Sequence, residues 1–179
     1  LMLEHNGQTA ITEKQLLAYR QQFLDDYEAD ICVDSVVFNE LEELLTVLER
    51  KGTPWGIVTN KPRYLAESLL DKIQLATRCS VLVCPEDVSR TKPDPEPMYL
   101  ALEKLGIARG GSACILYIGD HIRDIEAGNA AGMPTILAAY GYIPPEEQKS
   151  ITKWGANYIV ETPMQLKQLL LGSGKFDYL

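Results

Sequence analysis

The chain has 179 residues, of which 46% are hydrophobic and 23% charged, and its formal net charge at pH 7 is -8. A chain of this length can form one domain, or one domain with a small appendage, and can bury a sizeable core. The acidic balance, with a sequence pI near 4.8, argues against binding to nucleic acid or to anionic membranes, because both require a basic surface.

Two helices are predicted in the first third of the chain. Thr12 and Gln15 form a capping-box pattern, and apolar residues then recur at helical spacing. Asn39 and Glu42 repeat the capping pattern ahead of a stripe of leucines, which predicts a second helix over about residues 40–51.

Strand, polar loop and helix then alternate along the rest of the chain. The predicted strands, in chain order, cover residues 55–59, 81–84, 114–118, 135–138 and 158–160. The predicted helices cover residues 63–72 and 96–105, a segment ending near residue 132, and residues 164–170. This alternation predicts an α/β fold in which helices cover both faces of a mainly parallel sheet. The first helix, over about residues 12–28, could lie outside that domain.

Cysteine usage and hydropathy bear on the compartment. The four cysteines form no Cys-x-x-Cys pair, and three lie in or beside apolar, strand-like runs; they are Cys32, Cys79, Cys84 and Cys114. We therefore expect buried thiols in a reducing, cytoplasmic environment. We also expect neither a membrane span nor a signal peptide, since no long apolar run occurs and charged residues follow the first leucines at once.

Asp120 and Asp124 place two carboxylates where a buried strand gives way to a helix. In open α/β sheets, ligands bind beyond the carboxyl ends of the strands. Oxygen ligands without His or Cys at ligand spacing suit Mg²⁺ better than zinc. The alternative is that Asp120 caps the helix and that Asp124 is a solvated acid of its first turn.

Two further loops follow strands and carry polar side chains. Thr59 and Asn60 offer a hydroxyl, an amide and backbone N–H groups to phosphate oxygens. Lys92 precedes Asp94 and Pro95, which predict an N-cap and a first helical residue, and its ammonium could neutralise a phosphoryl group. The alternatives are a simple helix cap for Thr59 and Asn60 and a solvated loop lysine for Lys92.

The order of these motifs resembles the phosphatases of the haloacid dehalogenase (HAD) superfamily, which carry a Thr or Ser, a later Lys and a Gly-Asp-x-x-x-Asp loop. The resemblance covers about residues 16–170. Residues 58–61 and 92–95 are similar to phosphoglycolate-phosphatase-like members. Finer resemblance to the N-acetylmuramic acid 6-phosphate phosphatase subgroup rests on residues 84–87, 92–97, 119–126, 140–143 and 154–156.

The resemblance implies Mg²⁺-dependent hydrolysis of a small-molecule phosphomonoester through a phospho-aspartate intermediate. It implies that Thr59, Asn60 and Lys92 bind the phosphoryl group, and that Thr59 and Lys92 take part in catalysis. It implies that Asp120 and Asp124 hold the metal.

One part of the family pattern is absent. The family's first strand carries Asp-x-Asp-Gly-Thr, which supplies the nucleophile and the general acid, and the 179 residues contain no match. Residues 30–35 offer Asp30, Asp34 and Ser35, but they contain no Asp-x-Asp and no following Gly, so we expect no substitute nucleophile there.

In the family, the first strand lies in the middle of the sheet. We therefore expect a Rossmann-like HAD core over residues 35–179 that lacks its first, central strand, with the remnant of a helical cap over residues 1–34. Such a chain would be catalytically incomplete, and the initial Leu1 in place of Met fits a truncated form. Two inner strand edges would also be left unpaired.

Two other functions are considered. A non-catalytic HAD-fold module that acts through binding or homodimerisation would explain the missing nucleophile, but it would not need Thr59, Lys92, Asp120 and Asp124 together. A dehalogenase of the same superfamily is disfavoured, because that chemistry needs no acidic pair to hold a metal.

Overall fold

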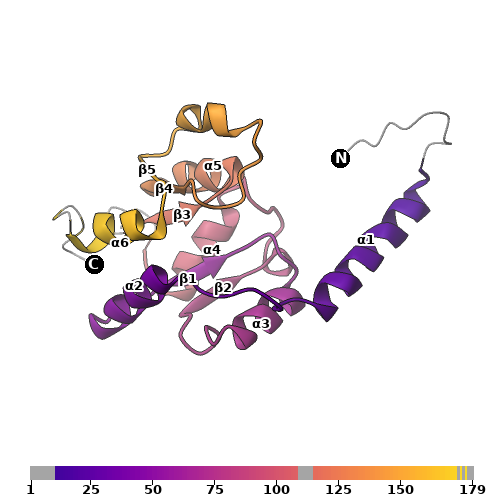
Figure 1. Ribbon diagram of the computed structural model, residues 1–179, viewed down its shortest axis with the longest axis horizontal. Helices are drawn as coiled ribbons and strands as arrows, with labels where there is room; N and C mark the ends of the chain where they lie inside the picture. Colours follow the sequence, from indigo (N-terminus) through magenta and orange to yellow (C-terminus); the bar gives the residue numbers. More distant parts are fainter. Residues whose placement is uncertain (1–10, 109–114, 173, 175, 177–179) are drawn as a thin grey trace. The chain divides into compact units, whose positions relative to one another are not determined.

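The computed structural model describes residues 11–108, 115–172, 174 and 176, so Leu1 and Cys114 lie outside the described residues. The chain divides into two compact units, Leu1–Ser35 and Val36–Leu179. Figure 1 shows the elements of both units in sequence colours.

The first unit contains helix α1, Glu13–Ala29. Its predicted capping box is confirmed: the Gln15 backbone N–H donates to Thr12 Oγ1 at 3.3 Å, and the Thr12 backbone N–H donates to Gln15 Oε1 at 2.9 Å. No residue of α1 is buried. The cap and the backbone hydrogen bonds of α1 therefore stabilise this helix, and burial of side chains contributes little.

The second unit contains the remaining elements. In chain order these are α2 (Asn39–Arg50), β1 (Gly56–Val58), α3 (Arg63–Lys72), β2 (Val81–Val83), the 3₁₀ helix η1 (Pro85–Asp87), α4 (Glu96–Lys104), β3 (Tyr117–Gly119), α5 (Ile122–Ala130), β4 (Thr135–Ala138), the 3₁₀ helix η3 (Gln148–Lys153), β5 (Tyr158–Val160) and α6 (Pro163–Gly172). The predicted alternation of strands and helices is confirmed. The two 3₁₀ helices were not predicted from the sequence.

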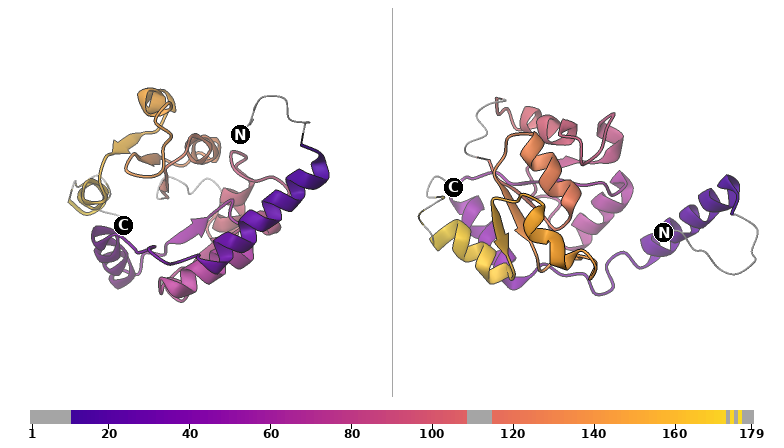
Figure 2. Two further views of the ribbon diagram at one scale, coloured as in Figure 1. Left: turned by 45° about the vertical axis from the view of Figure 1, so that its right-hand side comes forward. Right: turned by 90° about the horizontal axis from the view of Figure 1, so that it is seen from above.

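The strands form two parallel sheets. One joins β1 to β2, with Ile57 opposite Leu82. The other has the order β3-β4-β5, with Ile118 opposite Ile136 and Leu137 opposite Ile159. Within the described residues no strand pairing joins β1 to β3, so the parallel sheet is open in its middle (Figures 1 and 2).

Helices cover both faces of the larger sheet, as predicted. Ile136 and Leu137 in β4 are both fully buried, and successive strand residues point to opposite faces. Ile136 packs in a cluster with Leu44 of α2 and Leu166 of α6, whereas Leu137 packs with Ile125 of α5. Helix α4 contacts β1 and β2 of the smaller sheet.

Two predicted helix starts are wrong in detail. The N-cap of α2 is Phe38, which makes no side-chain cap, and Asn39 is already helical. The N-cap of α4 is Pro95, although the Glu96 backbone N–H donates to Asp94 Oδ1 at 2.9 Å. Asp94, which directly precedes the N-cap residue, therefore accepts a hydrogen bond from one of the free N–H groups at the start of this helix.

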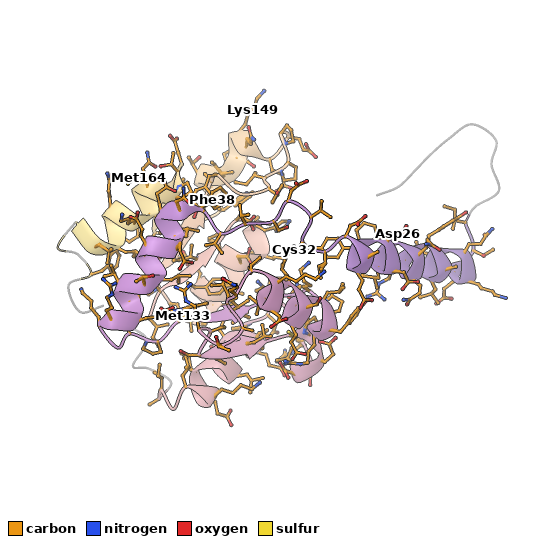
Figure 3. All side chains as sticks on the ribbon, turned by 60° about the horizontal axis from the view of Figure 1, so that its bottom comes forward. Asp26, Cys32, Phe38, Met133, Lys149 and Met164 are labelled. Carbon is orange, nitrogen blue, oxygen red and sulfur yellow. The ribbon has the colours of Figure 1, made fainter. Side chains whose placement is uncertain are left out.

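Burial differs among the described cysteines. Cys84 is buried, but Cys32 and Cys79 are partly exposed, and all three are free thiols. The prediction of buried thiols therefore holds for Cys84 alone among them. Figure 3 labels Cys32 together with Met133, which is buried, and Met164, which is 42% exposed on α6.

Across the described residues, no helix combines the length and the apolar character that a membrane crossing requires.

Candidate active site

The side chain of Lys92 lies between the two sheets. Its Nζ donates to Val58 O of β1 at 2.7 Å and to Tyr117 Oη of β3 at 2.9 Å, and it lies 2.7 Å from Asp124 Oδ1. Lys92 is only 9% exposed. It is therefore not a solvated loop lysine.

The loop after β1 is tied to the loop that carries Lys92. Asn60 Nδ2 donates to Lys92 O at 3.0 Å, and the Lys61 backbone N–H donates to Thr59 Oγ1 at 3.0 Å. The N-cap of α3 is Pro62, with no side-chain cap bond. Thr59 and Asn60 are therefore not the cap of this helix, and the polar atoms of both lie at the carboxyl end of β1.

The acidic pair is held by the loop after β3 and by the loop after β4. The His121 backbone N–H donates to Asp124 Oδ2 at 3.1 Å, and the Tyr142 backbone N–H donates to Asp120 Oδ2 at 3.1 Å. The N-cap of α5 is His121, not Asp120. Asp124 closes the capping box of α5 by accepting the His121 backbone N–H, and it is buried. Asp120 is therefore not the cap of this helix, and Asp124 is not a solvated acid.

Two glycines allow these carboxylates to pack closely. A Cβ atom at Gly119 would lie 2.3 Å from Asp124 Cβ, and one at Gly141 would lie 2.3 Å from Asp120 Cβ. Any larger residue would push the carboxylates away. The glycines therefore set the positions of the two acids.

The interior of the site is polar and strongly charged. Asp124 Oδ1 is the buried side-chain polar atom, among those described, that has no aligned hydrogen bond. It lies 2.7 Å from the Lys92 ammonium, which also donates hydrogen bonds to Val58 O and Tyr117 Oη, so this oxygen is held in a short ion pair. Burial and the nearby Asp124 carboxylate raise the pKa of Tyr117 well above its ordinary value. Tyr117 is therefore a neutral phenol at physiological pH.

The donors present fit Mg²⁺ better than zinc. No group of three or more His, Cys, Asp and Glu residues suited to a metal occurs in the described part of the chain. A structural or catalytic zinc needs three or four protein ligands, whereas Mg²⁺ commonly uses one or two carboxylates together with water and phosphate oxygens. Asp120 and Asp124 match that smaller set, and Asp124 Oδ1, which pairs with the Lys92 ammonium at 2.7 Å, is an oxygen that a bound cation could share.

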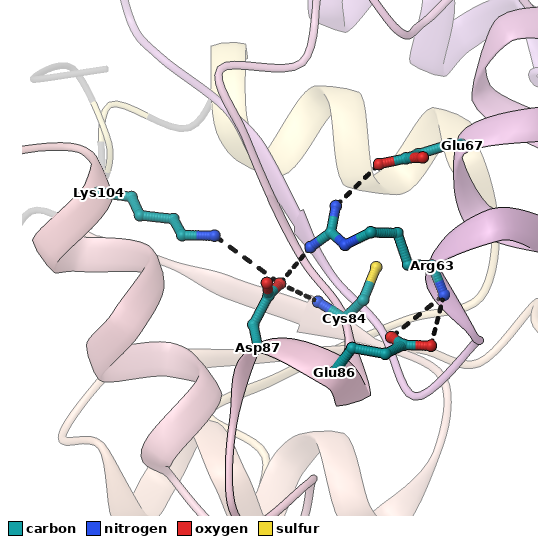
Figure 4. Close-up of polar contacts among 6 residues, drawn as sticks. All are labelled: Arg63, Glu67, Cys84, Glu86, Asp87 and Lys104. Atoms are coloured by element: carbon teal, nitrogen blue, oxygen red, sulfur yellow. Dashed lines mark hydrogen bonds and ion pairs between the residues drawn. The ribbon is translucent and has the colours of Figure 1, made fainter.

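A second polar cluster, missed in the sequence, fixes the start of α3 next to this loop (Figure 4). Both carboxylate oxygens of Glu86 accept the Arg63 backbone N–H, at 3.1 and 3.2 Å. The Arg63 guanidinium pairs with Glu67 at 2.9 Å and also with Asp87. These contacts connect α3 to the loop after β2.

Asp87 is the centre of that cluster. Its Oδ2 also accepts the Cys84 backbone N–H at 2.9 Å and lies 3.7 Å from Lys104 Nζ. The pKa of Asp87 lies below its ordinary value, mainly because of the Cys84 hydrogen bond and also because of Arg63 and Lys104. The acidic residues after a strand were the available signal, but nothing in their spacing identifies Arg63 as their partner.

A family model and the relatives most similar in sequence assign the chain to the same family. A family model described as haloacid dehalogenase-like hydrolase matches residues 3–138. The chain is 45% identical over 151 residues to an N-acetylmuramic acid 6-phosphate phosphatase of Pseudomonas aeruginosa, covering 84% of this chain and 65% of that protein. It is 39% identical over 145 residues to a phosphoglycolate phosphatase of Xanthomonas campestris, covering 81% of this chain and 63% of that protein. The chain thus spans less than two thirds of the length of either relative.

The fold is also similar to solved structures. A crystal structure of a predicted phosphoglycolate phosphatase from Haemophilus somnus matches with a TM-score of 0.75 and 25% identity, over 88% of this chain and 68% of that one. A hydrolase from Pseudomonas syringae matches with a TM-score of 0.74 and 25% identity, over 90% of this chain and 70% of that one.

Proposed function

The chain belongs to the haloacid dehalogenase-like hydrolase family, and from this membership we propose that its site binds the phosphoryl group of a small phosphomonoester for Mg²⁺-dependent hydrolysis. One observation carries the proposal: the buried Lys92 ammonium lies 2.7 Å from Asp124 Oδ1, at the strand ends that also carry Thr59 and Asn60. At such an edge, the ammonium can bind an anion while the adjacent carboxylate binds a cation.

Each residue has a distinct proposed role. Lys92 stabilises negative charge on the phosphoryl oxygens, and its fixed position gives that charge a preorganised partner. The Thr59 hydroxyl and the Asn60 amide donate hydrogen bonds to the same oxygens. Asp120 and Asp124 hold Mg²⁺, which when bound supplies positive charge to the phosphate and to the developing charge on the leaving oxygen.

The proposed reaction passes through a phospho-aspartate, and this chain contains no Asp-x-Asp-Gly-Thr segment to supply the nucleophile. We therefore propose that these 179 residues bind phosphate without turning over a phosphomonoester. Residues 1–34 are proposed to belong to a helical cap, and residues 35–179 to the α/β core. The proposed compartment is the cytoplasm.

The substrate is proposed to be a sugar phosphate or a small phosphorylated acid. The 45% identity to the N-acetylmuramic acid 6-phosphate phosphatase supports the sugar phosphate first, and phosphoglycolate is the other candidate. A non-catalytic binding or dimerisation module of the same fold is the second proposed function.

The test is calorimetric titration of the chain with inorganic phosphate, with and without Mg²⁺. We expect binding that requires Mg²⁺, is lost in Asp120→Asn and is retained in Asp71→Asn, an exposed acid of α3. Absence of phosphate binding in the folded chain would overturn the proposal. Turnover of N-acetylmuramic acid 6-phosphate by the chain alone would overturn its catalytic incompleteness.

A further inference from the structure

Tyr117 contacts the candidate site, yet it carries none of the proposed roles. Its Oη accepts from Lys92 Nζ at 2.9 Å and donates to Val58 O at 3.3 Å. The ammonium lies 5.6 Å from the ring centroid, which places it beyond the hydroxyl near the long axis of the ring. The contact is therefore made with the phenol oxygen and not with the face of the ring.

Packing holds the Tyr117 ring in place independently of Lys92. The ring packs against a cluster of four buried side chains, which are Met98, Leu102, Ala127 and Met133. A Cβ atom at Gly128 of α5 would lie 3.2 Å from Tyr117 Cβ and 3.3 Å from its Cδ1, so the helix backbone approaches the ring closely. The hydroxyl is therefore a fixed point beside the flexible lysine side chain.

The Lys92 ammonium has three N–H donors, and it rotates about its Cε–Nζ bond unless acceptors hold it. Two donors are held: they form hydrogen bonds with Val58 O at 2.7 Å and with Tyr117 Oη at 2.9 Å. These acceptors belong to a strand backbone and to a packed ring, so neither moves easily. The 2.7 Å contact with Asp124 Oδ1 is an ion pair without an aligned hydrogen bond. Among the described residues, the third N–H therefore has a fixed direction and no aligned acceptor.

We propose that Tyr117 is a positioning residue, which together with Val58 O fixes the rotation of the Lys92 ammonium and thereby directs its third N–H at a phosphoryl oxygen. The proposal rests on the proposed phosphate binding by Lys92. Partners that are fixed in advance bind an anion better, because no reorganisation is needed when it arrives. Without the Tyr117 hydroxyl, Val58 O would be the one fixed acceptor left, and the third N–H would lose its direction.

The first test is calorimetric titration of the chain and of Tyr117→Phe with inorganic phosphate in the presence of Mg²⁺. This variant keeps the ring and removes the hydroxyl, so we expect phosphate binding about two- to tenfold weaker, the effect of one hydrogen bond. Binding of Mg²⁺ alone should be unchanged, since Asp120 and Asp124 remain. Tyr64→Phe is the matched control, because Tyr64 is 42% exposed on α3, and it should bind both ions as the wild type does.

The outcomes separate this inference from the proposed function. Absence of phosphate binding by the wild-type chain would overturn both. Phosphate binding that is equal in the wild type and in Tyr117→Phe would overturn the positioning role alone. Equal losses of phosphate and Mg²⁺ binding in Tyr117→Phe would also overturn it, because a general structural defect affects both ions.

The second test observes the ammonium itself and needs no phosphate. The nitrogen–proton NMR signal of Lys92 Nζ, assigned by its loss in Lys92→Arg, reports whether the ammonium protons are held against exchange with water. We expect a slowly exchanging signal in the wild type and in Tyr64→Phe, and a broadened or lost signal in Tyr117→Phe. An unchanged signal in Tyr117→Phe would contradict the proposed fixing of the ammonium.

Discussion

The Lys92 ammonium and the Asp124 carboxylate lie 2.7 Å apart, and each side chain is only 8% exposed. Lys92 also donates to Val58 O of β1, whereas Asp124 belongs to α5, which packs on β3 and β4. This pair therefore connects the two sheets, between whose strands the described residues form no backbone hydrogen bond. The same contact forms the candidate anion and cation site, so site and architecture depend on one interaction.

Lys92→Met should destabilise the second unit. Loss of one partner from a buried ion pair leaves an uncompensated charge, which costs about 3–5 kcal/mol in the free energy of unfolding. The double variant Lys92→Met/Asp124→Leu removes both charges and should recover much of that loss. Urea denaturation of the three proteins measures the difference. Equal stability of the single and double variants would show that the pair is not coupled.

Gly141→Ala should displace the Asp120 carboxylate. An added Cβ would lie 2.3 Å from Asp120 Cβ, and such overpacking costs about 1–3 kcal/mol. We expect weaker Mg²⁺ binding in a calorimetric titration and a lower unfolding free energy. Gly172→Ala is the control, because a Cβ there meets no atom within 4 Å and Ala is favoured over Gly in a helix. Unchanged Mg²⁺ binding in Gly141→Ala would show that the close contact between Gly141 and Asp120 does not position the carboxylate for the metal.

Much of the fold can be predicted from the sequence because its signals are local. Helix α3 and strand β4 have the predicted limits, since apolar spacing and flanking Pro or Gly define each segment without help from distant residues. The cap pattern of Asn39 and Glu42 places the start of α2 one residue late, because Phe38 occupies the N-cap position without a side-chain cap. Phe38 packs edge-on against Tyr140, with ring centroids 5.7 Å apart, and that contact lies far outside the local sequence.

The site was predictable in residue type but not in arrangement. Lys92, Asp120 and Asp124 are found from their loops, yet the burial of Lys92 depends on Val58 O, 34 positions earlier in the chain. Similarly, no local pattern pairs Arg63 with Asp87 across two loops. Such contacts depend on the tertiary fold, which the sequence pattern does not encode residue by residue.

Asp87→Asn should lower stability at neutral pH and have a smaller effect in acid. The pKa of Asp87 is lowered in the folded chain, so its contribution is complete above the unfolded value of about 3.9 and is lost as pH falls through the folded value. Denaturation of the wild type and the variant at pH 7 and at about pH 3 compares the two regimes. Asp71→Asn, on the exposed side of α3, serves as the control. A stability difference that does not shrink in acid would contradict the assigned ionisation.

Tyr117→Phe should test the phenol that bridges the sheets. Tyr117 Oη donates to Val58 O at 3.3 Å and accepts from Lys92 Nζ at 2.9 Å, so its loss should cost about 0.5–1.5 kcal/mol. Because burial and Asp124 raise the pKa of Tyr117, the unfolded chain releases this proton first as pH rises above about 10. The wild type should therefore lose stability relative to Tyr117→Phe above that pH. Tyr142→Phe is the matched control, since the Tyr142 side chain is 97% exposed. We expect the alkaline loss of unfolding free energy to be absent in Tyr117→Phe and present in Tyr142→Phe. The same dependence of stability on pH in all three proteins would rule out a buried, neutral phenol at position 117.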